Sequence, residues 1–251
     1  MKVSIVTPSF NSARFIRQTI ESVLAQEGDF DIEYILQDGG STDDTVQIWE
    51  ELKSANTNPH ITMRAFSEKD AGMYDALNKG FARATGDIFA YLNSDDMYLP
   101  GALAAVATAF ANPGVEWVKG TNIVIDEDGA VIRRNRPLSY KRAWIRRGIY
   151  GRYAPFIEQE TVFWRRALWE KAGPFDASLR YAGDYKLWIN FAAHAELVSI
   201  ATAVSAFRRH GEQLSAGVGY RQEQARVLPP GGTVLEWLIK LFYWLKNRLG
   251  V

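Results

Sequence analysis

Short apolar runs alternate with longer amphipathic runs in the N-terminal part of the chain. The runs that have the length and β-branched content of buried strands are 2–7, 32–37, 61–66 and 87–92. The segments that carry apolar residues at helical spacing are 13–26, 42–52 and 74–85. Repeated strand–helix–strand order predicts an α/β fold, with a mostly parallel sheet covered by helices on both faces.

Polar clusters follow three of these predicted strands at their carboxyl ends. They begin at Pro8, Asp38 and Asn93, and the last contains the adjacent pair Asp95-Asp96. Ligands of such sheets bind beyond the carboxyl ends of the strands. The common position of the clusters therefore predicts one binding site at this edge of the sheet.

The pair Asp95-Asp96 is the strongest candidate for a metal site. Adjacent carboxylates repel one another unless a cation or hydrogen-bond donors offset their charge. Hard oxygen ligands suit Mg²⁺ or Mn²⁺, which also take substrate phosphates. The alternative is a solvated turn before a helix that begins near Pro100. The apolar strand before the pair and the two other clusters favour the metal site.

The run from Asp38 to Thr45 joins a predicted strand to a predicted helix. Gly39 and Gly40 allow a ligand to approach the backbone closely, and Asp38 can accept hydrogen bonds from a base or a ribose. The alternative is a turn in which Thr42 and Asp43 cap the helix. Capping accounts for part of the run, but it does not require two glycines after an aspartate.

Composition and charge exclude several classes of site. The 251 residues include no cysteine, which excludes disulfides, thiolate metal sites and cysteine nucleophiles. Lys plus Arg and Asp plus Glu both number 29, so the chain has no overall field for nucleic acid, and no nucleic-acid partner is expected. No signal-peptide pattern and no long uncharged stretch is present, so we expect a cytoplasmic protein.

The C-terminal half is less regular. Its predicted helices are 100–110, 166–171 and 184–194, and its predicted strands are 116–120, 122–125 and 197–201. Pro229-Pro230-Gly231-Gly232 is a break, and 234–249 reads as one tryptophan-rich helix. We therefore expect a domain over 1–228, with halves 1–98 and 99–228, followed by a linker and an amphipathic helix over 229–251.

Taken in order, these motifs resemble those of family 2 glycosyltransferases of the GT-A fold. The segments that carry the resemblance are Pro8-Ser9-Phe10-Asn11, 38–45, 67–80, 84–87 and Asn93-Ser94-Asp95-Asp96. The similarity covers about residues 1–215. It implies a nucleotide-diphosphosugar donor, with a UDP-sugar expected first, a divalent metal, and transfer with inversion at the anomeric carbon.

The resemblance also implies roles for individual residues. Pro8 and Phe10 would lie beside the base, and Asp38 would contact base or ribose. Asp95 and Asp96 would bind the ribose, the diphosphate and the metal. Many relatives have a second aspartate where this chain has Gly39, which leaves the choice of nucleotide open.

Two residues between the second and third clusters are further candidates for donor binding. Asp70 is expected close to the donor, because its counterpart in similar enzymes lies there. Lys79 would reach the phosphate or the sugar from a helix whose start, after Gly72, favours an anion. For Lys79 the alternative is a solvated position on the helix.

The catalytic base is expected in the C-terminal half. Relatives place it in a Glu-Asp pair at a helix start, after a Gly-x-Phe-Asp segment. Here Asp184 matches the base and Gly183 replaces the glutamate. Local sequence fits Asp184 equally well as an N-cap, and the two roles are compatible.

His210 resembles the closing segment of the family, near the metal or the diphosphate. A neutral imidazole is a reasonable third metal ligand beside carboxylates. A structural or solvated histidine is the alternative. The neighbouring Arg208 and Arg209 could clamp phosphate instead.

Two further segments suggest a carbohydrate or lipid-linked glycan acceptor. Segment 133–152 is rich in arginine and lysine and has no acidic residue, which favours an anionic partner over an ordinary solvated surface. The helix expected over 233–249 could lie at the inner face of the plasma membrane, or it could pack against protein. The expected role is the synthesis of a cell-surface or extracellular polysaccharide.

Two alternatives to a glycosyltransferase fit the same features less well. A nucleotidyltransferase that makes sugar nucleotides would carry a glycine-rich basic loop where this chain has Pro8-Ser9-Phe10-Asn11. A non-catalytic, membrane-associated nucleotide-sugar-binding protein would not need Asp95, Asp96 and Asp184 intact.

Overall fold

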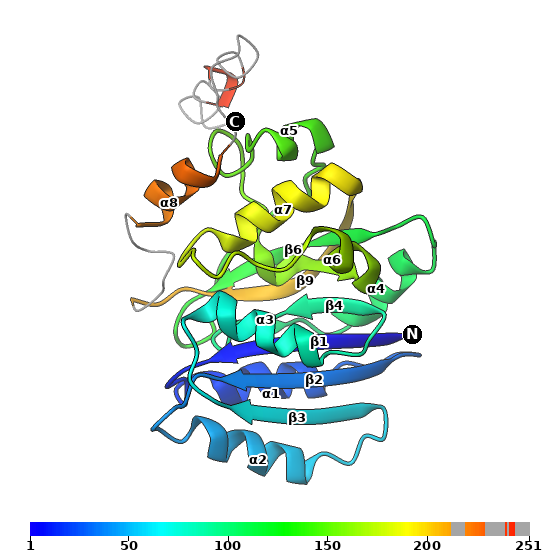
Figure 1. The fold of residues 1–251 in the computed structure, drawn as a ribbon. Coiled ribbons are helices and arrows are strands. Elements are labelled where there is room, and N and C mark those ends of the chain that lie inside the picture. Colours follow the sequence, from blue (N-terminus) through cyan, green and yellow to red (C-terminus); the bar gives the residue numbers. More distant parts are fainter. Residues whose placement is uncertain (212–218, 229–238, 240, 244–251) are drawn as a thin grey trace.

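Strands from both halves of the chain join in one sheet (Figure 1). The structure is a computed structural model of the chain, and it describes residues 1–211, 219–228, 239 and 241–243. Within these residues the sheet has nine strands, in the order β3-β2-β1-β4-β8-β6-β9-β5, with β7 paired to β6. Most of the helix expected over 233–249 lies outside the described residues.

The N-terminal elements follow the predicted alternation. They are β1 (Lys2–Ser9), α1 (Ile16–Leu24), β2 (Asp31–Asp38), α2 (Thr45–Ala55), β3 (Ile61–Ser67), α3 (Met73–Arg83), β4 (Ile88–Tyr91), β5 (Met97–Tyr98) and α4 (Ala102–Phe110). β1 pairs in parallel with β2 and β4, and β2 pairs in parallel with β3. Parallel pairing brings the ends of β1, β2 and β4 to one edge, as the sequence predicted.

The C-terminal elements extend the sheet in mixed orientation. They are β6 (Trp117–Ile125), β7 (Val131–Arg134), α5 (Arg142–Arg146), η1 (Gln159–Thr161), β8 (Val162–Arg165), α6 (Arg166–Ala172), α7 (Gly183–His194), β9 (Leu197–Arg208) and α8 (Gly219–Val227). β8 runs antiparallel to both β4 and β6, whereas β6 and β9 are parallel. The sheet is therefore parallel in the first half and mixed in the second.

Two of the expected boundaries in this half are wrong. The strands expected at 116–120 and 122–125 form the single strand β6, because Gly120 continues the strand across the contact with Val204. The strand expected at 197–201 continues to Arg208 in β9, since it pairs with the full length of β6. The extension carries the end of β9 to the edge where β4 ends.

Each face of the sheet buries its own apolar cluster. Side chains alternate between faces along a strand, so Ile5 of β1 joins the cluster under α1, α2 and α4, while Val6 joins the one under α3 and α7. Figure 1 shows α3 and α7 on one side of the sheet and α1 on the other. Helices on both faces are as the sequence predicted.

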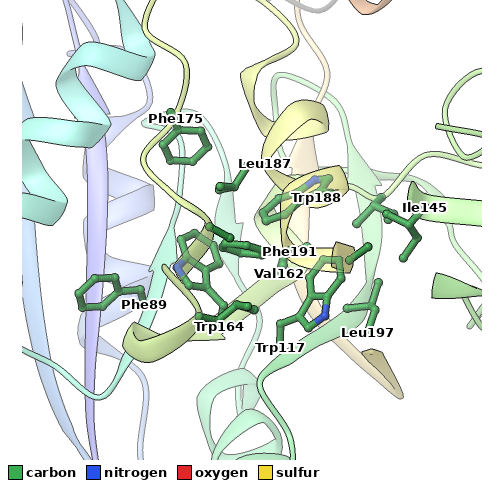
Figure 2. Close-up of a cluster of buried hydrophobic side chains, with 14 of the residues drawn as sticks. Phe89, Trp117, Ile145, Val162, Trp164, Phe175, Leu187, Trp188, Phe191 and Leu197 are labelled. Atoms are coloured by element: carbon green, nitrogen blue, oxygen red, sulfur yellow. The ribbon is translucent and has the colours of Figure 1, made fainter. Parts of the chain in front are cut away.

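Aromatic side chains fix α7 on the sheet. Trp188 of α7 lies 5.9 Å from Trp117 of β6 and 5.8 Å from Trp164 of β8, between ring centroids. Phe191 packs against the same two tryptophans, as Figure 2 shows. Such pairs add about 0.5–1.5 kcal/mol each beyond area burial. They hold the helix that begins at Gly183 in a fixed position on the strands.

Candidate active site

The loop after β1 presents an exposed aromatic ring. Phe10 is 62% exposed, whereas Pro8 on the strand is buried. Asn11 adopts a positive φ of 50°, its Oδ1 accepts from the Thr42 amide at 2.9 Å, and its amide donates to Ser41 Oγ at 2.8 Å. These bonds tie the loop after β1 to the loop after β2. The ring of Phe10 is thereby held at the edge of the sheet as a flat surface for stacking.

Asp38, at the end of β2, is fully buried, and both of its carboxylate oxygens accept hydrogen bonds from nearby protein groups. Its Oδ2 accepts from the Gly40 amide at 3.1 Å, the Ser41 amide at 2.9 Å and Ser67 Oγ at 2.6 Å. Its Oδ1 accepts from Ser41 Oγ at 2.5 Å. These hydrogen bonds show that Asp38 fixes the loop after β2, and its expected contact with base or ribose stays a prediction.

The carboxylate of Asp70 lies beside Gly39 and Phe10. Asp70 Oδ1 accepts from the Gly72 amide at 2.8 Å, while Oδ2 points toward Gly39. A Cβ at position 39 would lie 2.7 Å from Asp70 Oδ2 and 3.4 Å from the ring of Phe10. The structure thus brings Phe10 and Asp70 together around Gly39, although they come from different strand ends.

Lys79 and its neighbour Asn78 contact the protein itself. Lys79 Nζ pairs with Asp75 Oδ2 at 3.0 Å and donates to the Lys69 carbonyl at 2.8 Å. Asn78 exchanges two hydrogen bonds with the backbone of Phe175, at 2.9 and 3.0 Å. Lys79 closes the loop that carries Asp70, and its expected contact with the donor stays a prediction.

Asp95 and His210 meet at the end of β4. Asp95 Oδ2 and His210 Nε2 lie 2.8 Å apart, with side chains 24% and 7% exposed. The imidazole packs on Phe15, with ring centroids 5.0 Å apart. A carboxylate oxygen and an imidazole nitrogen this close can converge on one cation. Across the described residues, no group of three or more His, Cys, Asp or Glu side chains is placed to hold a metal ion.

Asp96 faces inward and differs from Asp95 in its partners. It is fully buried, Oδ1 accepts from the Arg208 amide at 3.0 Å, and Oδ2 lies 3.3 Å from Gln159 Nε2. Burial, and then the charges of Asp95 and Glu160, raise the pKa of Asp96 well above its ordinary value. The structure therefore shows Asp96 joining the end of β9 to β4. Its expected role as a metal ligand stays a prediction that this enclosed position disfavours.

Arg208 supports the same strand end from inside the protein. Its side chain is fully buried; Nε donates to the Asp95 carbonyl at 3.0 Å and Nη1 to the Glu127 carbonyl at 2.9 Å. Its guanidinium lies 4.8 Å from the ring centroid of Phe15. These contacts make Arg208 a support for Asp95 rather than the phosphate clamp considered from the sequence.

Glu160 is a buried acid beside this site that the sequence analysis did not single out. Its Oε1 accepts from Asn122 Nδ2 at 2.6 Å, and burial is the largest cause that raises its pKa to about 7. It follows Gln159, which reaches Asp96. In the sequence it lies among ordinary polar residues before a strand, so no local pattern could have marked it.

Asp184 lies in the first turn of α7 and is 6% exposed. Its Oδ1 accepts from the Tyr185 amide at 2.7 Å and lies 3.4 Å from the Tyr74 hydroxyl. Burial is the largest cause that raises the pKa of Asp184 to about 7. The N-cap residue is Ala182, and α7 has no side-chain cap bond, so the N-cap alternative for Asp184 is wrong. A buried carboxylate with this pKa suits a general base at neutral pH.

Tyr91 of β4 is a buried residue that the charge of Asp184 affects. It is the last residue of β4, four positions before Asp95, and it is fully buried. Burial, and then the nearby charge of Asp184, raise the pKa of the Tyr91 hydroxyl well above its ordinary value. The charge of Asp184 therefore acts on the last residue of β4, the strand that precedes Asp95 and Asp96.

Comparison with known proteins assigns this arrangement to a family. The family model described as glycosyl transferase family 2 matches residues 4–170. The chain belongs to glycosyltransferase family 2. It is therefore a glycosyltransferase, as the sequence predicted. The two alternative predictions, a nucleotidyltransferase and a non-catalytic protein, are wrong.

Several relatives in mycobacteria are similar over most of their length. An uncharacterized glycosyltransferase of Mycobacterium tuberculosis is 29% identical over 90% of this chain and 79% of its own. A PGL/p-HBAD biosynthesis glycosyltransferase of Mycobacterium bovis is 29% identical over 78% of this chain and 72% of its own.

Solved structures with low sequence identity share the GT-A fold. Staphylococcus aureus TarS 1–349 in complex with UDP-GlcNAc has a TM-score of 0.70 at 16% identity, covering 97% of this chain and 72% of its own. In another TarS 1–349 structure the similar region spans 60% of the TarS chain. Mannosyltransferase PcManGT from Pyrobaculum calidifontis, in complex with GDP-Man and Mn²⁺, has a TM-score of 0.67 at 19% identity, covering 98% and 70%.

Proposed function

We propose that this glycosyltransferase moves a sugar from a nucleotide diphosphosugar to an acceptor hydroxyl, with inversion and with a divalent metal. The observation that carries the proposal is the pairing of two separate acidic sites near one strand end. Asp95 with His210 can serve a leaving diphosphate, and buried Asp184 has the pKa of a base. The TarS and PcManGT complexes contain UDP-GlcNAc, UDP, or GDP-Man with Mn²⁺, which supports a nucleotide-sugar donor here.

Asp95 and His210 are the residues that would hold Mg²⁺ or Mn²⁺. The bound ion would offset the negative charge that grows on the leaving diphosphate. The donor set suits such an ion, because a carboxylate oxygen and an imidazole nitrogen lie 2.8 Å apart, and the ion would replace the proton that they share in their hydrogen bond. Phe15 packs against the imidazole ring of His210, and Arg208 donates to the backbone carbonyl of Asp95. These contacts hold the two proposed ligands in place.

Phe10 and Asp70 would receive the nucleoside. The exposed ring of Phe10 offers a stacking face for the base, and Asp70 Oδ2 offers an acceptor beside it. Pro8 and Asp38 would fix the loops on which these two side chains depend. A UDP-sugar is the donor we propose.

Asp184 would take the proton of the acceptor hydroxyl as its oxygen attacks the anomeric carbon. A new carbon–oxygen bond forms on one face of the sugar while the bond to the diphosphate breaks on the other, which inverts the anomeric centre. The Tyr185 amide holds the carboxylate, and the Tyr74 hydroxyl lies beside it. A pKa of about 7 places the base in balance with its protonated form near neutral pH.

The acceptor is proposed to be an anionic or lipid-linked glycan near a membrane. Arg133 and Arg134 are exposed on β7 beside Val131 and Ile132, which are 47% and 52% exposed. Basic and apolar side chains on one edge suit the surface of an anionic bilayer. Arg142 of the same segment is instead bonded to the carbonyls of Ala192 and Ala193.

The C-terminal segment is described at only a few positions. Ile239 is buried against the cluster under α7, while Phe242 is 60% exposed. No helix in the described part of the chain has both the length and the apolar character that crossing a bilayer requires. Co-sedimentation with anionic liposomes tests the membrane contact. Binding that survives deletion of residues from Gly232 onward would contradict a role for the segment.

Asp184→Asn tests the proposed reaction. Nucleotide-sugars are first screened for Mn²⁺-dependent thermal stabilisation, because a ligand that binds only the folded state raises apparent stability. The variant should keep this stabilisation and lose transfer by about 10²–10⁴-fold. Asp29→Asn, at an exposed position before β2, is the matched control and should keep both. Transfer by Asp184→Asn near the wild-type rate would refute the assignment.

A further inference from the structure

Glu223 binds the backbone directly before the helix that carries Asp184. Its Oε1 accepts from the Arg180 amide at 2.8 Å, and its Oε2 accepts from the amides of Tyr181 at 2.6 Å and Ala182 at 2.7 Å. Hydrogen bonds to an ionised acceptor are about twice as strong as neutral ones. One carboxylate on α8 thus holds three consecutive amides more than forty residues earlier in the chain.

The start of α7 depends on this contact. Free amides at a helix start need acceptors, and α7 has no side-chain cap of its own. The amide of its N-cap residue, Ala182, is one of the three that Glu223 binds. The acceptor that a Glu or Gln three residues into the helix supplies to the N-cap amide in a capping box therefore comes here from a distant helix.

The rest of α8 packs closely on the same loop. A Cβ at Gly219 would lie 2.6 Å from the ring of Tyr181, so the helix start approaches this ring as closely as glycine allows. Tyr220 meets Phe156 edge to face, with ring centroids 5.6 Å apart, and Gln224 is buried. Figure 1 shows α8 beside one end of α7.

We propose that Glu223 is a positioning residue for transfer: it fixes the backbone of residues 180–182 and through it the carboxylate of Asp184. The inference rests on the proposed role of Asp184 as the base. Gly183 alone separates the amides that Glu223 binds from Asp184. A small displacement of the base from the attacking oxygen costs a large factor in rate, so a fixed helix start contributes directly to transfer.

Glu223 also affects the charge state of the base. The ionisable groups that face Asp184 are Tyr74 from α3, Tyr91 from β4, Tyr185 from α7, and Tyr220 and Glu223 from α8. Burial is the largest cause of the raised pKa of Asp184, and the charge of Glu223 is a further cause. Removing this charge should lower the pKa of the base.

Two substitutions test the effect of the side-chain length of Glu223 and the effect of its charge separately. Glu223→Gln keeps the length but removes the charge and replaces one acceptor with a donor. Glu223→Asp keeps the charge but is too short to bind all three amides. Glu50→Gln, at an exposed position on α2, is the matched control.

The first measurement is hydrogen exchange of the amides of residues 180–182 in the full-length chain, which needs no substrate. Both Glu223 variants should exchange these amides about tenfold faster or more, a factor that corresponds to the loss of one net hydrogen bond. The amides of α2 and the Glu50→Gln control should match wild type. Unchanged exchange at residues 180–182 in both variants would overturn the proposal.

The second measurement is UDP release from UDP-GlcNAc with Mn²⁺ as a function of pH. Both Glu223 variants should lose about tenfold or more in kcat with an unchanged KM for the donor. Glu223→Gln should also move the acidic limb of the profile to lower pH, whereas Glu223→Asp should leave the limb in place. If Glu223 had only a structural role, its substitution would lower the amount of folded enzyme and would not move the acidic limb of the pH profile. Wild-type kcat in both variants would refute positioning.

Asp184→Asn, measured in parallel, distinguishes a failure of the proposed function from a failure of the positioning role of Glu223. If this variant keeps transfer, the proposed function fails, whatever the Glu223 variants do. If it loses transfer while both Glu223 variants keep wild-type kcat and pH profile, only the positioning role fails.

Discussion

Asp70 Oδ2 occupies the space into which a side chain at Gly39 would project, 2.7 Å from the ideal position of its Cβ. The family resemblance places a second aspartate at this point of the motif in many relatives. In this chain the carboxylate of Asp70, from the loop after β3, lies at the same place beside the ring of Phe10.

Gly39→Asp should weaken donor binding by about tenfold or more, because two carboxylates would share one site and repel each other. The double substitution Gly39→Asp with Asp70→Gly should recover most of the affinity. Calorimetric titration with UDP in the presence of Mn²⁺ measures both. Equal affinities of the single variant and wild type would show that the site is open enough for both groups.

As the proposed base, Asp184 should make both transfer and stability depend on pH. Its pKa is about 7 in the folded protein against an ordinary value of 3.8, so the folded state holds the proton more tightly. Transfer should therefore rise as pH increases through about 7, where the base loses its proton. Folding stability should fall over the range from about pH 4 to 7, by at most roughly 4 kcal/mol.

Asp184→Asn removes this titration, so it should be more stable relative to wild type at pH 8 than at pH 4. Urea unfolding at the two pH values measures the difference. A difference that does not change between them would mean that Asp184 titrates at its ordinary pKa in the folded protein.

Asp95 and Asp96 are adjacent in sequence but should respond differently to substitution. Asp95→Asn removes a charge that faces His210, so Mn²⁺-dependent binding of UDP should fall by about tenfold or more. Asp96→Asn should retain most of that binding, because both carboxylate oxygens already have protein donors, and should lower stability instead. Titration of UDP with and without Mn²⁺ separates the two. Loss of the metal effect in Asp96→Asn alone would assign the metal to Asp96.

Local patterns were sufficient to predict the first half of the fold. Strand periodicity, helix spacing and the turn at Asp38 all depend on neighbours in sequence, and parallel pairing then places the three polar clusters at one edge. The pairing of Asp95 with His210 was suggested only by resemblance, because it joins residues 115 positions apart.

The remaining features depend on contacts that no local pattern encodes. Gly183 stands where the family resemblance places a glutamate, and a Cβ there would lie 2.7 Å from the ring of Tyr74. Glu160 owes its raised pKa, and Glu223 its three amides, to burial and packing between distant segments. The mixed order of β8, β6 and β9 likewise follows from pairing over long separations.

Arg208→Lys should destabilise the protein although it preserves the charge. The guanidinium donates through three separate nitrogens to the Asp95 carbonyl, the Glu127 carbonyl and Gln18 Oε1. The single ammonium group of a lysine cannot reach all three acceptors. Each buried carbonyl left without a donor costs about 1–3 kcal/mol, so the loss should be about 3 kcal/mol or more. Urea unfolding measures it, with Arg17→Lys on the exposed face of α1 as the matched control, where a surface ion pair contributes about 0–1 kcal/mol. Because Arg208 also holds the carbonyl of Asp95, the variant should require more Mn²⁺ for UDP binding, and an unchanged Mn²⁺ requirement would separate this arginine from the metal site.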